Sequence, residues 1–183
     1  MTLTLRIRYI LAILLVGVIA SSSIWYLGYH EKGPIYSYNA TRDHDDLLDL
    51  FELERFWLTS TPDYSPQFML KYMTPNKDPK YRNALHISVM RIDGAFVGFT
   101  AYYMHNKDIG MILFLVTRPE FRGKGYGKDL IRHAIAELKK MGAQQVNLVT
   151  RTTNIPAQKV YTAVGFDEIL RDEQGYVYYE YTK

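Results

Sequence analysis

The sequence predicts an α/β domain of the α+β type, with a mixed, mostly antiparallel sheet and helices on both of its faces, plus one N-terminal transmembrane helix. Three observations predict this. Residues 9–27 contain no charged side chain. Strand-like alternations with a hairpin turn fill residues 85–104, and an amphipathic helical pattern occupies residues 125–141. We therefore assign residues 1–32 to an anchor and linker and residues 33–183 to one globular domain.

The composition is that of an ordinary globular chain and excludes several kinds of chemistry. The 183 residues, 48% of them hydrophobic, allow one domain and a short appendage. A net charge of +3 is too small to indicate a nucleic-acid-binding surface, so we expect no nucleic-acid partner. The absence of cysteine excludes disulfides, thiol catalysis and Cys-ligated zinc and leaves the redox compartment open. The oligomeric state is left open as well.

The N-terminal apolar run has the length of a membrane span. Residues 9–27 would form a helix about 28 Å long, close to the roughly 30 Å of a bilayer's hydrocarbon core. Arg6 and Arg8 precede the run, Trp25 and Tyr26 lie at its C-terminal end and Tyr29 follows it, as interfacial residues do. We interpret the run as a membrane anchor.

Two other interpretations of this segment stay open. In a cleaved signal peptide, residues 10–19 would be the apolar region and Val18-Ile19-Ala20 the cleavage site. A buried core helix is the second alternative. Arginines before the run are matched by Lys32 and Arg42 after it, so the positive-inside rule decides little about topology.

The first part of the domain predicts a strand and two helices. Gly33-Pro34 starts a linker into a short strand at 35–39. A helix follows from Asp43, its expected N-cap, to about Leu58, with acidic residues in its first turn where the helix dipole favours them. A first helical turn explains the acidic cluster at residues 43–49 better than a metal site does. Four prolines within 59–83 surround an apolar stretch, which predicts a small helix between loops.

The second part supplies most of the sheet. Alternation from Leu85 to Val89, the type I′ turn signal Asp93-Gly94 and the return to Met104 predict a hairpin. The almost continuously apolar stretch from Ile109 to Val116 predicts a central strand buried on both faces. The remaining elements are a helix at 125–141, a strand at 146–150, a helix at 155–164 and a closing hairpin at 166–181. The predicted order is β-α-α-β-β-β-α-β-α-β-β.

The stretch from Thr117 to Gly127 carries the clearest chemical signal. Its glycines at alternate positions allow a tight turn that brings backbone N–H groups together at the start of a helix. Such amides, with the helix dipole, bind phosphate, and Arg122 and Lys124 add positive charge. The glycine spacing fits neither a Walker A loop nor a dinucleotide fingerprint. A glycine-rich turn without a ligand is the alternative explanation.

Two motifs in order resemble those of the GNAT superfamily of N-acetyltransferases. Arg122-x-x-Gly125-x-Gly127 resembles the family's acyl-CoA-binding signature. The second block is Asn154-Ile155-Pro156-Ala157, then Tyr161, then Gly165-Phe166. The resemblance covers about residues 85–183, and residues 35–83 match only in outline. It implies a GNAT-like fold. It also implies an enzyme that transfers an acetyl group from acetyl-CoA to a primary amine by direct attack, without a covalent intermediate or a metal.

The resemblance also implies roles for single residues. Tyr161 would be the general acid that protonates the leaving thiolate, and Asn154 would contact the cofactor through its side-chain amide. Backbone groups of Leu115, Val116 and Thr117 would bind the pantetheine arm, and an amide near Val116 would stabilise the oxyanion. The residues implied at the pyrophosphate are Arg122, Gly123, Lys124, Gly125, Tyr126, Gly127 and Lys128.

The general base is left unassigned. A lysine-like amine is protonated at pH 7 and must lose a proton before it attacks. Many relatives carry a glutamate on the central strand, whereas this strand has no ionisable residue. His105, Asp108, Glu180 or a water chain could serve. We interpret His86 and His133 as packing or surface residues.

The acceptor, a small molecule or a protein, is not identified by the sequence. Tyr64, Tyr72 and Tyr81 are candidate contacts for it. Two alternatives to acetyl transfer are transfer of a longer acyl chain and a non-catalytic CoA-binding or regulatory module, which the missing strand carboxylate favours. Because acetyl-CoA is a cytosolic metabolite, we expect a single-pass membrane protein whose domain faces the cytosol, although the N-terminal amine slightly favours the opposite orientation.

Overall fold

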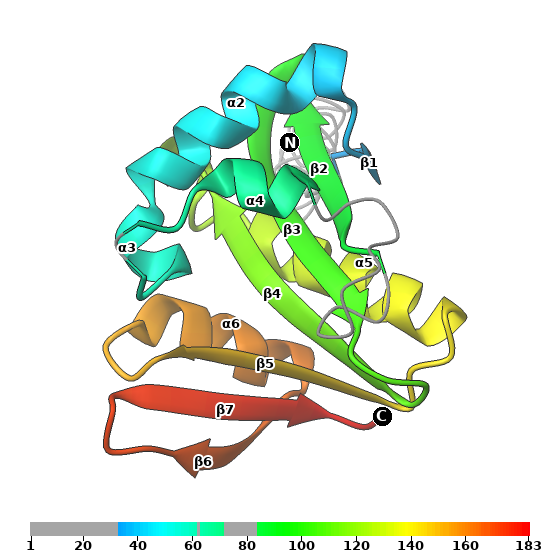
Figure 1. The fold of residues 1–183 in the computed structure, drawn as a ribbon, viewed down its shortest axis with the longest axis vertical. Helices are drawn as coiled ribbons and strands as arrows, with labels where there is room; N and C mark the ends of the chain where they lie inside the picture. Colours follow the sequence, from blue (N-terminus) through cyan, green and yellow to red (C-terminus); the bar gives the residue numbers. More distant parts are fainter. Residues whose placement is uncertain (1–32, 62, 72–83) are drawn as a thin grey trace, which may run out of the picture. The chain divides into compact units, whose positions relative to one another are not determined.

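A computed structural model describes residues 33–61, 63–71 and 84–183 of the chain (Figure 1). The segment for which we predict a membrane anchor, residues 9–27, lies outside these ranges. Within them, no helix combines the length and the apolar character needed to cross a membrane. All the described residues belong to one compact unit of the chain, Lys32–Lys183.

The strands of the described residues form one mixed sheet in the order β1-β2-β3-β4-β5-β7-β6. They are β1 (Ile35–Ser37), β2 (His86–Ile92), β3 (Ala95–Met104), β4 (Ile109–Thr117), β5 (Gln145–Arg151), β6 (Asp167–Arg171) and β7 (Tyr176–Tyr181). All neighbouring strands are antiparallel except β4 and β5, which are parallel. The prediction of a mixed, mostly antiparallel sheet is confirmed.

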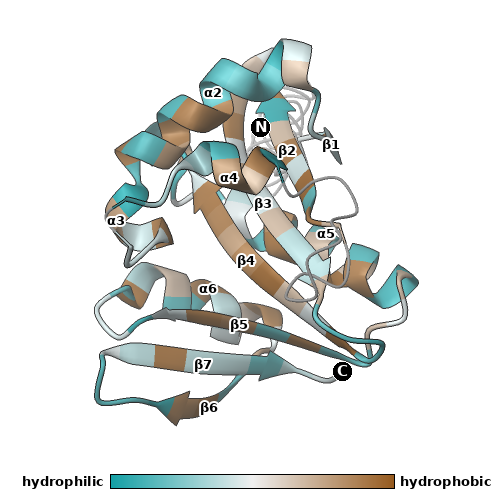
Figure 2. Cartoon of the chain, in the orientation of Figure 1, coloured by the Kyte–Doolittle hydropathy of each residue, from teal (hydrophilic) through white to brown (hydrophobic). Residues whose placement is uncertain are grey.

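Helices cover both faces of the sheet, as predicted (Figure 1). The helices are α2 (Ala40–Leu53), α3 (Arg55–Leu58), α4 (Pro66–Lys71), α5 (Tyr126–Lys140) and α6 (Ile155–Val164). Leu50, Phe51 and Met69 from α2 and α4 pack on one face, and Ile131 and Tyr161 from α5 and α6 belong to the core on the other. Figure 2 shows hydrophobic and hydrophilic residues alternating along α2 and α5, as in helices with one buried face.

The β2–β3 hairpin has the predicted turn. Asp93 and Gly94 have φ angles of 49° and 81°, and both must be positive in a type I′ turn. Ile92 pairs with Ala95 directly before and after the turn. The Asp-Gly signal therefore fixes the register of these two strands.

The N-cap of helix α2 lies four residues before the predicted one. Asn39, not Asp43, is the N-cap, and its side-chain oxygen accepts a hydrogen bond from the Arg42 N–H. Asp43 is fully buried, and its carboxylate accepts hydrogen bonds from Arg42 and Arg91. The prediction was wrong because the partner that draws Asp43 inward, Arg91, lies far away in the sequence.

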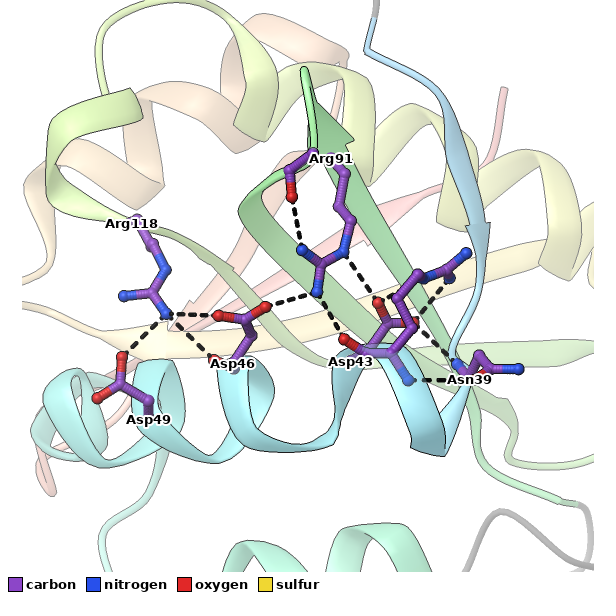
Figure 3. A network of polar contacts seen from close by, with 8 residues as sticks. Asn39, Asp43, Asp46, Asp49, Arg91 and Arg118 are labelled. Carbon is purple, nitrogen blue, oxygen red and sulfur yellow. Dashed lines mark hydrogen bonds and ion pairs between the residues drawn. The ribbon is translucent and has the colours of Figure 1, made fainter.

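Figure 3 shows how acidic side chains along α2 attach this helix to the sheet. Arg91 on β2 also pairs with Asp46, and Arg118, which follows β4, pairs with Asp46 and Asp49 at 3.5 and 2.9 Å. The acidic cluster is therefore an ion-pair network. The described part of the chain holds no group of three or more His, Cys, Asp or Glu residues arranged to bind a metal.

The helix predicted to reach Leu58 is interrupted at Glu54. The backbone of Glu54 has φ −107° and ψ 10°, outside the helical region, and α3 starts after it. The Glu54 side chain is buried and forms an ion pair with Arg122 at 2.5 Å. The interruption therefore coincides with a buried acid that is paired with the loop before α5.

Strand β4 differs from the prediction of a strand buried on both faces. Its side chains alternate between buried and accessible, and Leu113 is 41% exposed. Ala101 pairs with Phe114 and Tyr102 with Ile112, so Leu113 is an extra residue without a partner in β3, a β-bulge. The run is continuously apolar because accessible side chains of β4 line an apolar pocket.

Candidate active site

The candidate site lies where the only parallel strand pair of the described sheet comes apart. β4 and β5 pair through Ile109–Met111 and Gln145–Asn147. Beyond these residues the two strands diverge (Figure 1), and no described strand pairs with the β5-facing edge of β4 from Ile112 to Thr117. Backbone N–H and C=O groups at such an edge need partners. A ligand with amide groups of its own can supply them.

A pocket of about 930 Å³ occupies this split. Its walls come from the second half of β4, the loop before α5, the start of α6, the end of β5, and α3 with the residues after it. Of the site residues predicted from the sequence, all except Lys124 line it: Leu115, Val116, Thr117, Arg122, Gly123, Gly125, Tyr126, Gly127, Lys128, Asn154 and Tyr161. The fold thus brings both sequence motifs to one cavity.

The glycine-rich loop has the geometry of an anion-binding site. Gly123 and Gly125 have φ angles of 76° and 86°, a region that costs other residues roughly 1–2 kcal/mol. Within the described residues, no backbone carbonyl accepts the N–H groups of Gly123, Lys124, Gly125 or Gly127. A Cβ at Gly127 would meet nothing within 4 Å. Unpaired amides at the start of α5 are arranged to bind phosphate.

The three cations of the loop have different surroundings. Arg122 donates to the Thr117 carbonyl and pairs with Glu54. The Lys124 ammonium lies 5.3 Å from the centre of the Phe121 ring and does not line the pocket. Lys128 lines the pocket and forms no ion pair with any described residue. Of these three cations, Lys128 is therefore the one that both lines the pocket and lacks an ion pair with a described residue.

Tyr161 reaches the pocket from α6 and is otherwise enclosed. It is 6% exposed, and the rings of Phe166 and Tyr179 pack against it at 6.2 and 5.5 Å. Burial raises the pKa of Tyr161, and a hydrogen bond with Thr150 opposes this only in part. The phenol is therefore protonated at neutral pH, which is the form that a general acid needs.

Asn154 has a structural role that sequence reasoning missed. It is the N-cap of α6, and its side-chain oxygen accepts a hydrogen bond from the Ala157 N–H at 3.4 Å. Its amide nitrogen has no hydrogen-bond partner among the described residues and lies on the pocket wall. One side chain can therefore start the helix and also donate to a ligand.

Glu54 is a functional candidate that the sequence analysis did not single out. It is 7% exposed and is the one carboxylate among the described residues that line the pocket. A signal was present, because Glu54 continues the apolar stripe of Leu47, Leu50 and Phe51 at helical spacing. An acid on the buried face of a helix needs a charged partner, and Arg122 provides it.

The acids and histidines suggested as a base lie elsewhere. His105, Asp108 and Glu180 do not line the pocket, and Glu180 accepts a hydrogen bond from Gln145. His133 is a packing residue, as predicted: its Nε2 lies 3.0 Å from the Ser88 hydroxyl, and burial lowers its pKa.

Of the three tyrosines suggested as acceptor contacts, Tyr64 lines the pocket. The other two, Tyr72 and Tyr81, lie outside the described residues.

The fold and the pocket together are those expected of an acyltransferase, because a split parallel strand pair, an anion-binding loop and a buried tyrosine line one cavity. Residues 45–166, well over half of the chain, match the acetyltransferase (GNAT) family. The chain belongs to this family.

Curated relatives match part of the chain. A mycothiol acetyltransferase from Actinosynnema mirum is 32% identical over 88 residues, 47% of this chain and 30% of the relative. A putative [ribosomal protein bS18]-alanine N-acetyltransferase from Bacillus subtilis is 31% identical over 94 residues, 49% of this chain and 62% of the relative. The matched part therefore spans less than two thirds of either relative.

Solved structures share the fold across most of the chain. Ard1 from Thermoplasma volcanium superimposes with a TM-score of 0.64 at 18% identity, covering 82% of this chain and 97% of that one. A Bacillus subtilis acetyltransferase in complex with CoA superimposes with a TM-score of 0.64 at 19% identity, covering 83% of this chain and 99% of that one. At these identities the similarity establishes the fold alone.

Proposed function

We propose that this protein transfers an acetyl group from acetyl-CoA to a primary amine by direct attack of the amine on the thioester. The observation that carries the proposal is the pocket in the β4–β5 split. It joins an anion-binding loop, an unpaired strand edge and Tyr161 in one cavity. Membership of the acetyltransferase (GNAT) family supports the same activity.

The chain's own groups fit acetyl-CoA. The amides of residues 123–127 and the Lys128 ammonium suit the pyrophosphate, because both offer positive charge at a helix N-terminus. The free edge of β4 at residues 115–117 suits the two amides of pantetheine, which can pair with it as a strand would. The Asn154 amide nitrogen supplies one more donor from the opposite wall.

Acetyl-CoA supplies the thioester, and residues of the chain stabilise the charges that form. A backbone N–H near Val116 would donate to the developing oxyanion. As the C–N bond forms and the C–S bond breaks, Tyr161 would give its proton to the thiolate, whose conjugate acid has a pKa near 8.5. Thr150 assists because its hydrogen bond partly opposes the rise of the Tyr161 pKa. The proton of the attacking amine would leave through water, since Glu54 is ion-paired with Arg122.

The acceptor end of the pocket is the part that the cofactor groups do not use. Its walls are Trp57, Tyr64, Leu113, Val149 and Tyr176. Leu113 and Val149 are 41% and 43% exposed, so they can contact a bound acceptor. Two relatives are named for acetylation of an alanine in ribosomal protein bS18. We take a peptide with a free N-terminal alanine as the first acceptor to test.

We further propose that residues 9–27 anchor the domain in a membrane with the domain on the cytosolic side. The length and apolar character of this segment support an anchor, and the need for acetyl-CoA supports a cytosolic domain.

Thermal unfolding of the purified full chain tests the cofactor. Acetyl-CoA at about one hundred times its Kd should stabilise the protein by about 2.7 kcal/mol and raise the Tm by roughly 5–10 °C. ATP at the same concentration should not. Stabilisation by ATP but not by acetyl-CoA would overturn the proposal.

Thiol release from acetyl-CoA with a panel of amines then tests catalysis. The panel contains the alanine peptide, a lysine peptide and a small diamine. Release that depends on an amine supports an enzyme, whereas binding without release with any amine supports the non-catalytic module. Octanoyl-CoA in place of acetyl-CoA tests the longer acyl chain.

A further inference from the structure

Arg151 is the last residue of β5 and stands at the open end of the split. There it pairs with Tyr176 of β7 and lines the pocket. Its backbone is fixed from behind by the buried Gln158, whose amide nitrogen donates to the carbonyls of Arg151 and Thr152 at 3.1 and 2.8 Å. Arg151 therefore projects its side chain from a rigid position.

The Arg151 side chain crosses from β5 to α3. Its Nε donates to the Phe56 carbonyl at 3.0 Å, and its Nη2 donates to the Thr59 carbonyl at 3.2 Å. The guanidinium carbon lies 4.6 Å from the centre of the Phe56 ring and 5.8 Å from that of Tyr176. The last carbonyls of a helix have no partner within the helix, so Arg151 caps the C-terminus of α3 from the other side of the split.

The Arg151 guanidinium forms no ion pair with a described residue. Both hydrogen bonds of its side chain to described residues go to backbone carbonyls, one in α3 and one in the residue that follows it. A cation at a helix C-terminus is favoured by the helix dipole, and a guanidinium stacked on aromatic rings gains further attraction. The side chain thus acts as a bridge between two walls of the pocket.

Helix α3 depends on contacts of this kind. It has four residues, no side-chain N-cap and no buried residue. Leu58, which is partly buried, packs against the core, so core packing holds the end of the helix but not Phe56 or Trp57. The Phe56 ring that Arg151 covers packs against Trp57 at 4.8 Å, and Trp57 lines the pocket. Loss of Arg151 should therefore release Trp57 while the core stays folded.

We infer that Arg151 is a positioning residue that holds α3 across the open end of the split and fixes the acceptor wall formed by Trp57. This inference rests on the proposed acetyl transfer, because it assigns that wall to the acceptor. Among the described residues, the Arg151 side chain contacts Phe56, Thr59 and Tyr176 and none of the groups assigned to acetyl-CoA, so acetyl-CoA binding should not depend on it.

The test compares Arg151→Gln, Arg151→Lys and a control, Arg132→Gln, in the full chain. Arg132 lies on α5, is 57% exposed at its side chain and does not line the pocket. Each variant also carries Trp25→Phe, which leaves Trp57 as the single tryptophan of the two in the chain. Acrylamide quenching of Trp57 fluorescence reports on α3 without any acceptor, and calorimetry gives the Kd of acetyl-CoA.

For Arg151→Gln we expect at least a twofold rise in the quenching constant of Trp57 and an acetyl-CoA Kd within twofold of the parent. With the N-terminal alanine peptide as probe, KM should rise tenfold or more with kcat within threefold. Arg151→Lys should recover part of both effects, because an ammonium can still donate to one carbonyl, and Arg132→Gln should match the parent.

Unchanged quenching and unchanged KM in Arg151→Gln would overturn the inference. A rise of the acetyl-CoA Kd as large as the rise in KM would also overturn it, because the substitution would then disturb the whole pocket and not the acceptor wall alone. If the parent protein itself fails to bind acetyl-CoA, the proposed function fails, which the same calorimetry shows separately.

Discussion

Tyr161 is the residue on which the proposed chemistry depends most. We expect Tyr161→Phe to lower kcat by roughly 10²–10⁴-fold, the range of general acid catalysis, because the ring keeps its packing while the proton donor is lost. The KM for acetyl-CoA should change little. Thiol release at saturating acetyl-CoA measures this.

Tyr179→Phe is the matched control for Tyr161. Tyr179 is buried beside Tyr161 in the same core cluster but does not line the pocket. Its variant should keep the parent kcat. Equal kcat in Tyr161→Phe and the parent would remove the acid role from Tyr161.

Asn154 allows its two roles to be separated. Asn154→Asp keeps a good N-cap for α6 but replaces the amide donor by a negative charge, so we expect an unchanged Tm and a tenfold or greater rise in the acetyl-CoA Kd. Asn154→Ala should weaken binding and also lose roughly 1 kcal/mol of stability. Calorimetry and urea unfolding measure the two effects. Normal binding by Asn154→Asp would contradict the cofactor contact.

Single residues differ in how far the sequence predicts them. The glycines of the anion-binding loop and Tyr161 belong to motifs with a fixed spacing, and the structure brings them to one pocket. Glu54 and Arg151 belong to no motif, because their partners, Arg122 and the carbonyls of α3, come from distant parts of the chain. Helical spacing places Glu54 on the buried face of α2, but nothing local in the sequence indicates which distant group it or Arg151 pairs with.

Helix α2 is attached to the sheet by the network around Asp43. We expect Asp43→Ala to destabilise the fold by roughly 3 kcal/mol, because it removes a fully buried carboxylate that pairs with Arg42 and Arg91 and leaves Arg91 with Asp46 alone. The control is Asp45→Ala on the same helix, an exposed acid whose loss should cost no more than about 0.5 kcal/mol. Urea unfolding measures both, and equal stability of the two variants would contradict the network's role.

The same carboxylate predicts a pH dependence. Burial on its own would raise the pKa of Asp43, but hydrogen bonds from Arg42, the Asn39 N–H and Arg91 outweigh it and leave the pKa below its ordinary value of 3.8. The unfolded state therefore binds the proton more readily. The contribution of Asp43 is present above pH 3.8 and is lost as pH falls through the lower pKa of the folded state.

Urea unfolding between pH 2 and 5 checks this expectation. The parent should lose stability more steeply below pH 3.8 than Asp43→Ala does. Parallel pH curves for the two proteins would show that Asp43 titrates alike in the folded and unfolded states.

At the level of elements, hydrophobic periodicity predicted most strands and helices but not their surroundings. The apolar run of β4 predicts a strand buried on both faces, whereas the structure exposes Leu113 in a bulge beside the pocket. A run of apolar residues is the same whether its second face meets a core or an apolar cavity. The divergence of β5 from β4, which only the folded structure shows, is what places a cavity rather than a core beside this face.

For the whole molecule, we expect residues 33–183 to fold without the N-terminal segment. Both large hydrophobic clusters and the α2 network are formed by residues of this range. A chain of residues 33–183 should unfold in one cooperative transition and bind acetyl-CoA with a Kd within threefold of the full chain. Aggregation of the shorter chain, or loss of binding, would contradict this.

Membrane attachment is tested on the same pair of proteins. After extraction of membranes at high pH, the full chain should stay in the pellet and residues 33–183 should be released. An intact N-terminus in the extracted protein would exclude cleavage of a signal peptide.

The sequence by itself determined the order of the elements, the hairpin turn at Asp93-Gly94, and the two motifs that carry the family resemblance. These features depend on contacts within a few residues, which spacing and periodicity record. Tertiary structure alone decided that β4 and β5 separate after three pairs, that Glu54 pairs with Arg122, and that Arg151 reaches α3. Those features join residues distant in sequence, and their free energy depends on burial and on charges that meet only when the chain is folded.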